Sequence, residues 1–395
     1  MKISHRAAAL QPSATVGMDT RAKEMARAGQ DVISFAVGEP DFPTPEHICE
    51  AARQALAAGH TKYTPASGLP ELKEAIVGRL YAEFGLSYDP AQVCVSNGGK
   101  HALMNIWETL LDPGDEVIIF APYWVSYPEQ IQLCGGQPVI IMTDAERGFQ
   151  PDLDQVRNAV TDRTVAVLIN SPSNPTGGIF ERDILTGLAE IAAERDLTII
   201  SDEIYKHLLY DGRQHLSIAS LDDETKARTI IADGVAKNYA MTGWRIGWLI
   251  APKQFAGKAG AIQSQETSNP CSISQYAALA ALTGPQDCVA QMRAQFAQRR
   301  DFFVAKLREI EGLQCQMPPG AFYVFPDFSA HLGRELGGKR LDTSLALAEY
   351  LLETALISTV PGSAFGAEGY IRFSFACSVE QLQRGAERLA RALAV

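Results

Sequence analysis

The chain of 395 residues is 46% hydrophobic and carries a net charge of −11 at pH 7. Its length suggests two or three domains, and the acidic balance argues against nucleic acid or an anionic membrane as a partner. No apolar run approaches the roughly 18 residues that span a membrane, and the apolar stretch near the N-terminus is too short for a signal peptide. Seven cysteines without a CxxC pair and seven histidines without ligand spacing lead us to expect no disulfide framework, no metal and a reducing cytoplasm.

The N-terminal segment is expected to hold one helix, at 18–28, followed by a turn-rich strap at 38–42. After it, apolar strand-like runs alternate with helical patterns such as 182–195. Strands buried on both faces read as continuous runs of Val, Ile and Leu, which predicts an α/β fold with a mostly parallel seven-stranded sheet between helices. The expected strands are 92–96, 116–120, 138–142, 164–170, 197–201, 228–232 and 246–251.

From about residue 290 the pattern changes and predicts a smaller α+β domain. Its expected helices are 288–311, 343–355 and 379–393, and its expected strands are 321–325 and 370–375. We therefore expect three parts: a segment 1–43 that packs on the small domain and on a partner, a large domain 44–287, and a small domain 288–395.

Lys237 lies in a Gly- and Ala-flanked loop after the apolar run 229–232, and Arg245 follows eight residues later at the start of another apolar run. A lysine amine can form a Schiff base with an aldehyde, and a guanidinium can hold a phosphate through two hydrogen bonds. The pair therefore suits a phosphorylated aldehyde cofactor. The alternative is a solvated surface lysine beside a structural arginine.

Asp202 follows the run 197–201, where a carboxylate at the end of a buried strand is costly unless it is paired. A cationic ring nitrogen would suit it, and Tyr205 could reach the same ligand if the turn is helical. The alternative for Asp202 is a helix N-cap. Asn174 also follows a buried run, and the alternative for it is a turn asparagine. Trp124 follows another such run, and its indole could stack on a planar ring; the alternative for Trp124 is core packing.

The segment Ser96-Asn97-Gly98-Gly99-Lys100 joins an expected strand to an expected helix at 101–111, where free backbone N–H groups could hold a phosphate. It lacks a full P-loop pattern, and a plain glycine turn is the alternative. Arg372 alternates with apolar neighbours on a strand, so it must meet solvent or an anion, for which a carboxylate is the best mate.

Ten segments, taken together and in this order, resemble the class I, fold-type I aminotransferases, with the bacterial aspartate aminotransferases as the nearest likeness. The segments are PSAT near residue 12, GEPDF at 38, KYTPASGLPELKEAI at 62, SNGGK at 96, PYWVSYPE at 122, NSPSNPTGG at 170, SDEIY at 201, AKNYAMTGWRIG at 236, GAFYVFP at 320 and PGSAFG at 361.

The resemblance implies pyridoxal 5′-phosphate as cofactor, with Lys237 as its covalent anchor and as the catalytic base. It implies that Asp202 pairs with the protonated ring nitrogen, and that Tyr205 assists at the ring's phenolic oxygen together with Asn174. Trp124 would stack on the ring beside the substrate. Gly98, Gly99, Lys100 and Arg245 would surround the phosphate. Tyr63 would reach the phosphate of the neighbouring subunit, so the resemblance implies a homodimer.

The substrates implied are amino acids and 2-oxo acids, with 2-oxoglutarate as acceptor and aspartate as the expected donor. Arg372 and Asn174 would hold the α-carboxylate near Gly38. Transfer from aromatic or other neutral amino acids, and a carbon–sulfur β-lyase of the same fold, stay open as alternatives. So do a ligand-sensing regulator and a protein that has lost its cofactor.

The chain departs from the family pattern at three positions. Gly234 stands where members often carry a serine for the phosphate, and Gln11 stands where dual aspartate/prephenate members tend to have a basic residue. Glu108 occupies the place of a basic residue that, in some members, binds the distal carboxylate. Glu108 would repel that group if it lines the pocket, leaving Ser13 and Thr15 to bind it; alternatively it faces solvent.

Overall fold

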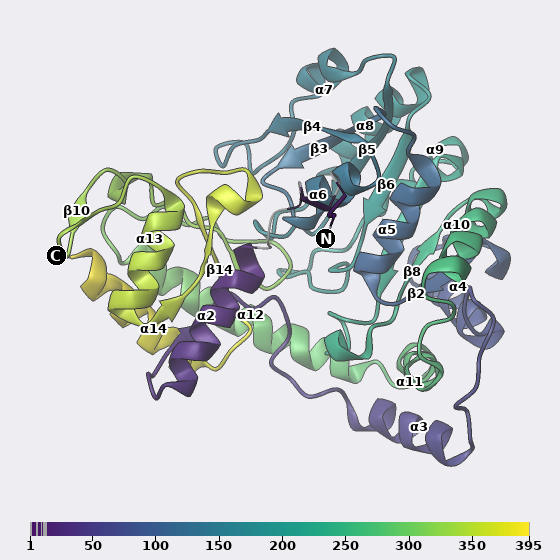
Figure 1. Ribbon diagram of the computed structural model, residues 1–395, viewed down its shortest axis with the longest axis horizontal. Coiled ribbons are helices and arrows are strands. Elements are labelled where there is room, and N and C mark those ends of the chain that lie inside the picture. The colour runs from purple at the N-terminus through teal and green to yellow at the C-terminus, as the bar shows by residue number, and fades with distance from the viewer. Residues whose placement is uncertain (1, 5–6, 9, 11–13, 395) are drawn as a thin grey trace.

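The computed structural model describes residues 2–4, 7–8, 10 and 14–394, arranged as two layered parts connected by a long helix (Figure 1). Gln11 and Ser13 lie outside the described residues, and so does the side chain of Thr15. In the described part of the chain, no helix has both the length and the apolar character that a membrane crossing requires.

The larger part is built on a seven-stranded sheet in the order β2-β8-β7-β6-β5-β3-β4. Neighbours from β4 to β7 pair in parallel, whereas β8 runs antiparallel to both β7 and β2. Each expected strand of this sheet is present, with ends displaced by no more than two residues. The strands are β2 (Val93–Ser96), β3 (Glu116–Ala121), β4 (Gln137–Met142), β5 (Thr164–Asn170), β6 (Thr198–Asp202), β7 (Thr229–Gly234) and β8 (Gly247–Ile250).

Burial explains the continuous apolar runs. Every residue of β3 and β7 is buried, and successive side chains of β3 enter different hydrophobic clusters on the two faces of the sheet. The expectation of burial on both faces is wrong for β4, where Ile140 and Met142 are exposed. The reason is position, because β4 is the last strand of the sheet and lacks a neighbour on one side.

Helices cover both faces of this sheet. Val117 and Ile119 pack in the cluster that includes α5, α6 and α10, while Ile118 packs in the cluster that includes α7 and α8. The helices of this part are α3 (Glu46–Ala57), α4 (Pro70–Phe84), α5 (Gly99–Leu110), α6 (Ser126–Leu133), α7 (Leu153–Ala159), α8 (Arg182–Glu194), α9 (Asp223–Ala227), α10 (Lys253–Glu266) and α11 (Ser272–Thr283). Short 3-10 helices lie at Pro90–Gln92, Ile218–Ser220 and Thr242–Trp244 here, and at Ser329–His331 and Gly362–Phe365 further on.

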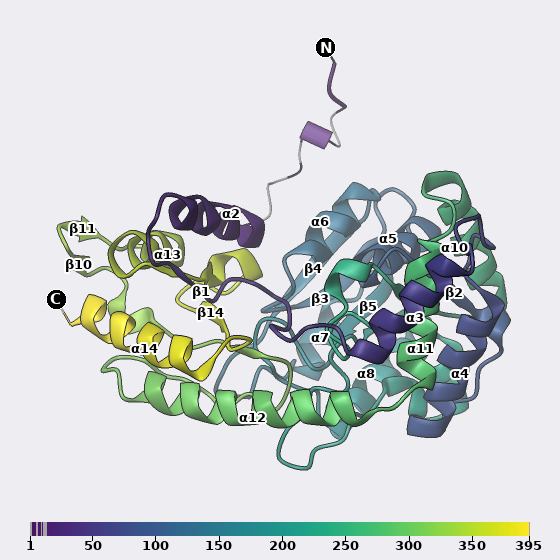
Figure 2. The ribbon, with the colours of Figure 1, turned by 90° about the horizontal axis from the view of Figure 1, so that it is seen from below.

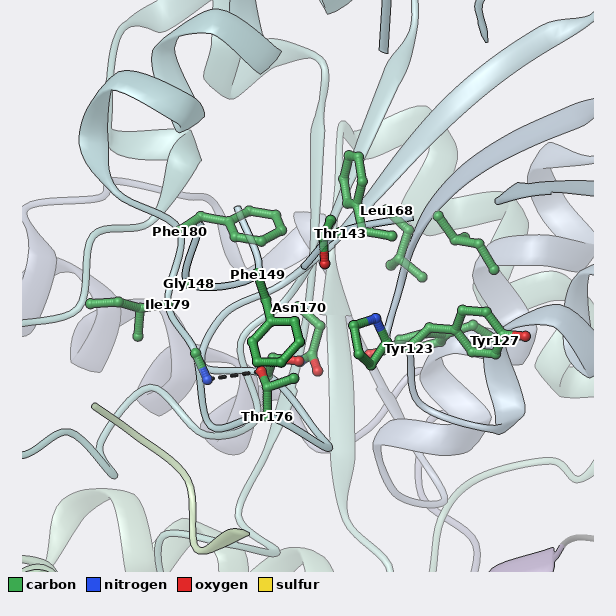
Figure 3. A pocket seen from close by; sticks show the side chains of 15 residues that line it. Tyr123, Tyr127, Thr143, Gly148, Phe149, Leu168, Asn170, Thr176, Ile179 and Phe180 are labelled. Carbon is green, nitrogen blue, oxygen red and sulfur yellow. Dashed lines mark hydrogen bonds between the residues drawn. The ribbon is translucent and has the colours of Figure 1, made fainter. Parts of the chain in front are cut away.

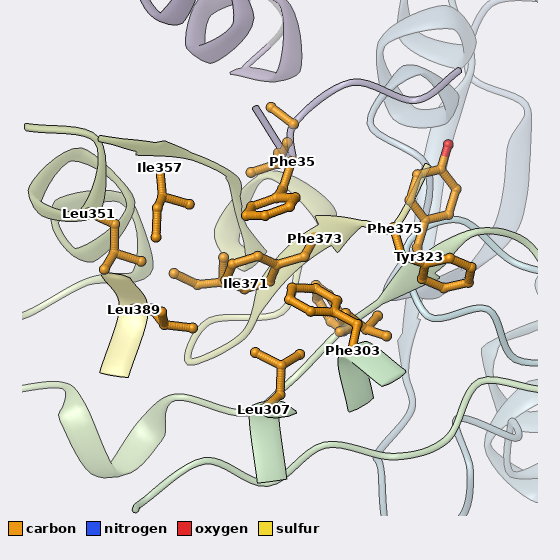
Figure 4. Close-up of a cluster of buried hydrophobic side chains, with 14 of the residues drawn as sticks. Phe35, Phe303, Leu307, Tyr323, Leu351, Ile357, Ile371, Phe373, Phe375 and Leu389 are labelled. Atoms are coloured by element: carbon orange, nitrogen blue, oxygen red, sulfur yellow. The ribbon is translucent and has the colours of Figure 1, made fainter. Parts of the chain in front are cut away.

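Helix α12 (Asp287–Arg308) leads from the larger part to the smaller one (Figure 2). Its Phe303 packs with Phe35 and Phe373 in the core of the smaller part (Figure 4). The expected helix at 343–355 is α-helical only at first and continues as a π-helix. The other elements are β9 (Tyr323–Val324), β10 (Glu335–Leu336), β11 (Lys339–Arg340), α13 (Ser344–Tyr350), the π-helix Leu351–Ala355, β12 (Ile357–Ser358), β13 (Val360–Pro361), β14 (Ile371–Ser374) and α14 (Val379–Leu393).

The N-terminal segment packs on the smaller part. Strand β1 (Ile33–Ser34) pairs in parallel with β12, and helix α2 (Ala14–Arg27) lies beside α13 (Figure 2). Two salt bridges join Arg21 of α2 to Glu349 and Glu353. The strap that follows β1 then passes from the smaller part to the larger one, so residues 36–39 lie between them.

Candidate active site

A cavity of about 440 Å³ opens where β5, β6 and β7 end. This edge is where ligands of parallel sheets bind, and the antiparallel β8 begins at the same edge. The cavity collects ten of the twelve residues predicted for the site. They are Gly38, Gly99, Lys100, Trp124, Asn174, Asp202, Tyr205, Lys237, Arg245 and Arg372.

Gly98 and Tyr63 do not line the cavity. Gly98 lies directly behind it, because a Cβ added there would be 2.6 Å from Nη2 of Arg245. The Tyr63 side chain is far from enclosed, with 90% of the residue exposed. Helix α5 reaches the cavity with Gly99, Lys100 and Leu103, but Glu108, further along the same helix, does not line it. The geometry therefore does not support a place for Glu108 in the distal pocket.

Lys237 sits in the turn that follows β7, with its amine directed at the strap. Its Nζ donates a hydrogen bond to the carbonyl oxygen of Gly38 at 2.5 Å. Burial lowers the pKa of Lys237 to about 8; Glu39 opposes this effect, while Arg372 and Arg245 add to it. The amine therefore loses its proton more readily than an ordinary lysine.

Asp202 ends β6 at the floor of the cavity. Its Oδ2 accepts a hydrogen bond from the hydroxyl of Tyr127 at 2.7 Å, and its Oδ1 accepts one from the backbone N–H of Ile204 at 3.2 Å. Burial raises the pKa of Asp202 to about 6, although both hydrogen bonds oppose the shift. Tyr127 was not among the predicted site residues, because its only signal in the sequence is an aromatic side chain three residues after Trp124, at the start of α6.

Arg372 lies on β14 in the smaller part and is buried. Its Nη1 donates to Oδ1 of Asn174 at 2.8 Å and its Nη2 donates to the carbonyl oxygen of Ala36 at 2.6 Å. Its Nε has no hydrogen-bond partner among the described residues. The guanidinium stacks on the ring of Tyr323 at 4.5 Å, and the Tyr323 hydroxyl pairs with that of Tyr205 at 2.8 Å. Tyr323 was also missed, because one tyrosine in an apolar strand reads as core.

Residues 30–389 match the family model described as aminotransferase class I and II. The chain belongs to this family. It is 48% identical to an aspartate aminotransferase of Geobacillus stearothermophilus, over 99% of this chain and 98% of that protein. Its fold superimposes on the aspartate aminotransferase of Rhizobium meliloti with a TM-score of 0.96, at 41% identity over 100% and 99% of the two chains. The Thermus thermophilus aspartate aminotransferase with maleate gives a TM-score of 0.93, at 44% identity over 99% and 100%.

Aminotransferases of this family depend on pyridoxal phosphate, and the cavity of this aminotransferase fits that cofactor. Lys237 offers a reactive amine close to the buried carboxylate of Asp202. Lys100 and Arg245 both line the cavity. Burial, followed by the charge of Arg245, lowers the pKa of Lys100, so the two cations lie near each other. Two neighbouring cations of this kind suit a bound phosphate.

The backbone behind these cations leaves no room for side chains. A Cβ added to Gly234 would lie 2.9 Å from both Cα of Gly247 and the carbonyl oxygen of Ile246. Gly234 and Gly247 are register partners on β7 and β8, and a Cβ on Gly247 would lie 2.3 Å from the backbone nitrogen of Gly99. A serine at position 234 therefore does not fit this aminotransferase without a backbone shift, which explains the first departure from the family pattern.

A second cavity of about 30 Å³ lies beside the first, and Tyr127 and Asn170 line both (Figure 3). Its other walls are mainly apolar and include Phe149 and Phe180, and none of the described residues that line it is charged. Tyr127 therefore borders both cavities, and its hydroxyl donates to Asp202.

Proposed function

We propose that this aminotransferase transfers the amino group of L-aspartate to 2-oxoglutarate. One observation carries the proposal: a single cavity holds both the Lys237 amine, with a pKa of about 8, and the buried Arg372. The Nε–H of Arg372 has no partner among the residues that the structure describes. The Lys237 amine suits proton transfer at an amino acid's α-carbon, and Arg372 suits its α-carboxylate. Similar proteins named aspartate aminotransferases support aspartate as donor.

Pyridoxal phosphate, when bound, supplies an aldehyde that captures amines and a ring that withdraws electrons from the α-carbon. We propose that Lys237 anchors it, that Asp202 holds a proton on the ring nitrogen, and that Trp124 stacks on the ring. Tyr205 and Asn174 would serve the phenolic oxygen. Gly98, Gly99, Lys100 and Arg245 would hold the phosphate, and Tyr63 would reach the phosphate of the neighbouring subunit.

The reaction then depends on three side chains of this chain. The Lys237 amine takes the proton from the substrate's α-carbon, a task that favours a base with a pKa near the working pH. Arg372 orients the substrate through its α-carboxylate, with Asn174 already bonded to Nη1. The buried walls of Tyr323 and Tyr205 keep water from this side of the cavity.

We propose a homodimer in the cytoplasm as the working form. The exposed position of Tyr63, outside its own cavity, supports a role at a partner's site. We also propose that the chain divides into a segment 1–43, a large domain 44–287 and a small domain 288–395. The packing of α2 and β1 on the smaller part supports this division.

A donor panel tests the proposal. Purified enzyme is assayed for glutamate formation from 2-oxoglutarate with aspartate, phenylalanine, leucine and lysine as donors. We expect the highest kcat/KM for aspartate. A higher kcat/KM for phenylalanine or leucine would show that the preferred donor is a neutral amino acid. Release of pyruvate and ammonia from a sulfur-substituted alanine, without any oxo acid, would identify the β-lyase instead.

A further inference from the structure

A buried ion pair lies beneath the active site and has no part in the proposed reaction. Lys206, in the turn after β6, contacts the carboxylate of Asp233 near the end of β7, and their side chains are only 5% and 1% exposed. Asp233 lines the cavity, whereas Lys206 does not. The ammonium therefore acts from behind the wall of the site and touches neither cofactor nor substrate.

Glu203 forms the second half of the same buried cluster. Its Oε1 accepts hydrogen bonds from the hydroxyls of Ser201 at 3.0 Å and Ser217 at 2.5 Å, and its Oε2 lies 2.9 Å from Nε2 of His215. Burial alone would raise the pKa of Glu203, but His215 and then Lys206 bring it below its ordinary value. Glu203 thus stays ionised because basic groups surround it.

Three buried carboxylates, those of Asp202, Glu203 and Asp233, therefore lie together at the ends of β6 and β7. After burial and the two hydrogen bonds, Asp233 and Glu203 are the groups that raise the pKa of Asp202. Lys206 interacts with both of these neighbours, and they raise its own pKa although burial opposes them. Among the described residues, the other titratable groups that interact with Asp202 are Tyr127, Tyr205 and Lys237. Those that interact with Lys206 include Glu83 and His207.

We propose that Lys206 is a positioning residue, whose buried ammonium offsets the negative charge of Asp233 and Glu203 so that Asp202 stays ionised for the cofactor's ring nitrogen. This inference rests on the role of Asp202 in the proposed function. An ionised Asp202 attracts the ring proton, whereas a protonated one does not. The field of Lys206 favours the ionised form, because an opposite charge near a carboxylate always does so.

The test measures the effect of the Lys206 ammonium in variants that lack the Asp233 charge. D233N and K206M/D233N both lack the Asp233 charge and differ only in the charge of Lys206. For each holoenzyme, the dissociation constant of pyridoxal phosphate is measured by equilibrium dialysis from pH 5 to 8. In the wild type, affinity should weaken as pH falls through about 6, where Asp202 takes up a proton. The cofactor's own titrations are common to all variants. The proposal is therefore judged from the differences between the pH midpoints of the variants.

We expect the midpoint of K206M/D233N to lie about 0.5–1 pH unit above that of D233N, because losing the ammonium makes Asp202 easier to protonate. Coincident midpoints, or the reverse order, overturn the proposal. If the double variant does not fold, K206Q/D233N, which keeps a hydrogen-bond donor, gives the same comparison. K258M, on the exposed face of α10, is the matched control and should behave as the wild type.

K206M alone gives an independent readout, the pH dependence of thermal unfolding. The pKa of Asp233 is already raised by burial, although Lys206 opposes this, and loss of the ammonium should raise it further. A carboxyl whose folded pKa exceeds its unfolded pKa favours the folded state at low pH, and that contribution is lost as pH rises through the folded pKa. The Tm of K206M should therefore fall relative to wild type as pH rises, and a parallel pH dependence contradicts the proposal.

D202N distinguishes a failure of the role proposed for Asp202 from a failure of the role proposed for Lys206. If D202N keeps the wild-type midpoint, Asp202 does not govern cofactor binding and the assignment in the proposed function fails. If D202N loses the midpoint while D233N and K206M/D233N coincide, the assignment stands and only the role of Lys206 fails.

Discussion

The two walls of the cavity are built in different ways. On the cofactor side, Asn170 and Asp202 are register partners on adjacent strands, so backbone hydrogen bonds of one sheet fix their separation. On the substrate side, Arg372 contacts Ala36 and Asn174, which lie 336 and 198 residues away in the sequence. The first wall is a property of one sheet, whereas the second exists only while the two parts are docked. Changes at the first wall should therefore affect chemistry and cofactor, and changes at the second should affect substrate affinity.

The largest effect is expected at the cofactor wall. Lys237→Ala removes the amine that we propose anchors the cofactor and moves the α-proton, so kcat should fall by about 10⁴-fold or more. Single-turnover formation of glutamate measures it, and the covalent link to the cofactor should be absent from the near-visible spectrum. Lys258→Ala, an exposed lysine on α10, is the control. Near-wild-type turnover of Lys237→Ala would remove this residue from the mechanism.

The next effect is expected at the substrate wall. Arg372→Ala should raise KM for every amino-acid donor alike, since each presents the same α-carboxylate. Loss of a buried charged pair costs about 2–5 kcal/mol, which is roughly 30- to 5,000-fold in affinity. Arg372→Lys should lose less, because it keeps the charge without the two-pronged geometry. A loss confined to dicarboxylic donors would instead place Arg372 at the distal end of the site.

A smaller effect, on stability, is expected where the cofactor wall consists of backbone alone. Gly234→Ser forces a side chain against Gly247 and Ile246, so it should destabilise the fold by about 1–3 kcal/mol. The added hydroxyl should not compensate by tighter cofactor binding. Thermal unfolding of Gly234→Ser is compared with that of Gly257→Ser, where an added Cβ meets nothing within 4 Å. Equal Tm values would show that the sheet yields easily at this point.

The smallest effect is expected at Glu108. Because Glu108 does not line the cavity, Glu108→Lys should change KM for aspartate and for phenylalanine equally or not at all. Steady-state kinetics with both donors measures this, and phenylalanine serves as the internal control. A selective fall in KM for aspartate would show that the side chain reaches the distal carboxylate after all, as the family pattern suggested.

Sequence reasoning was strongest where structure is local. The continuous apolar runs placed all seven strands of the large sheet, and polar residues at their ends indicated Asp202, Asn174 and the turn with Lys237. The same reasoning missed Tyr127 and Tyr323, which meet Asp202 and Tyr205 across 75 and 118 residues of sequence. A tyrosine in an apolar setting reads as core, and nothing local shows which hydroxyl it will meet. The buried pair of Lys206 was missed for the same reason, because its partner Asp233 belongs to the next strand.

The reversed direction of β8 has a consequence for length variation. Since β7 ends and β8 begins at the cavity, residues 235–246 form a hairpin connection that carries both Lys237 and Arg245. Inserting or deleting one residue there would displace Lys237 and Arg245, the proposed cofactor anchor and phosphate ligand, together. Among the described residues that line the cavity, none belongs to a loop at the opposite end of the sheet. In related chains, this connection should therefore keep a constant length while the loops at the far end drift.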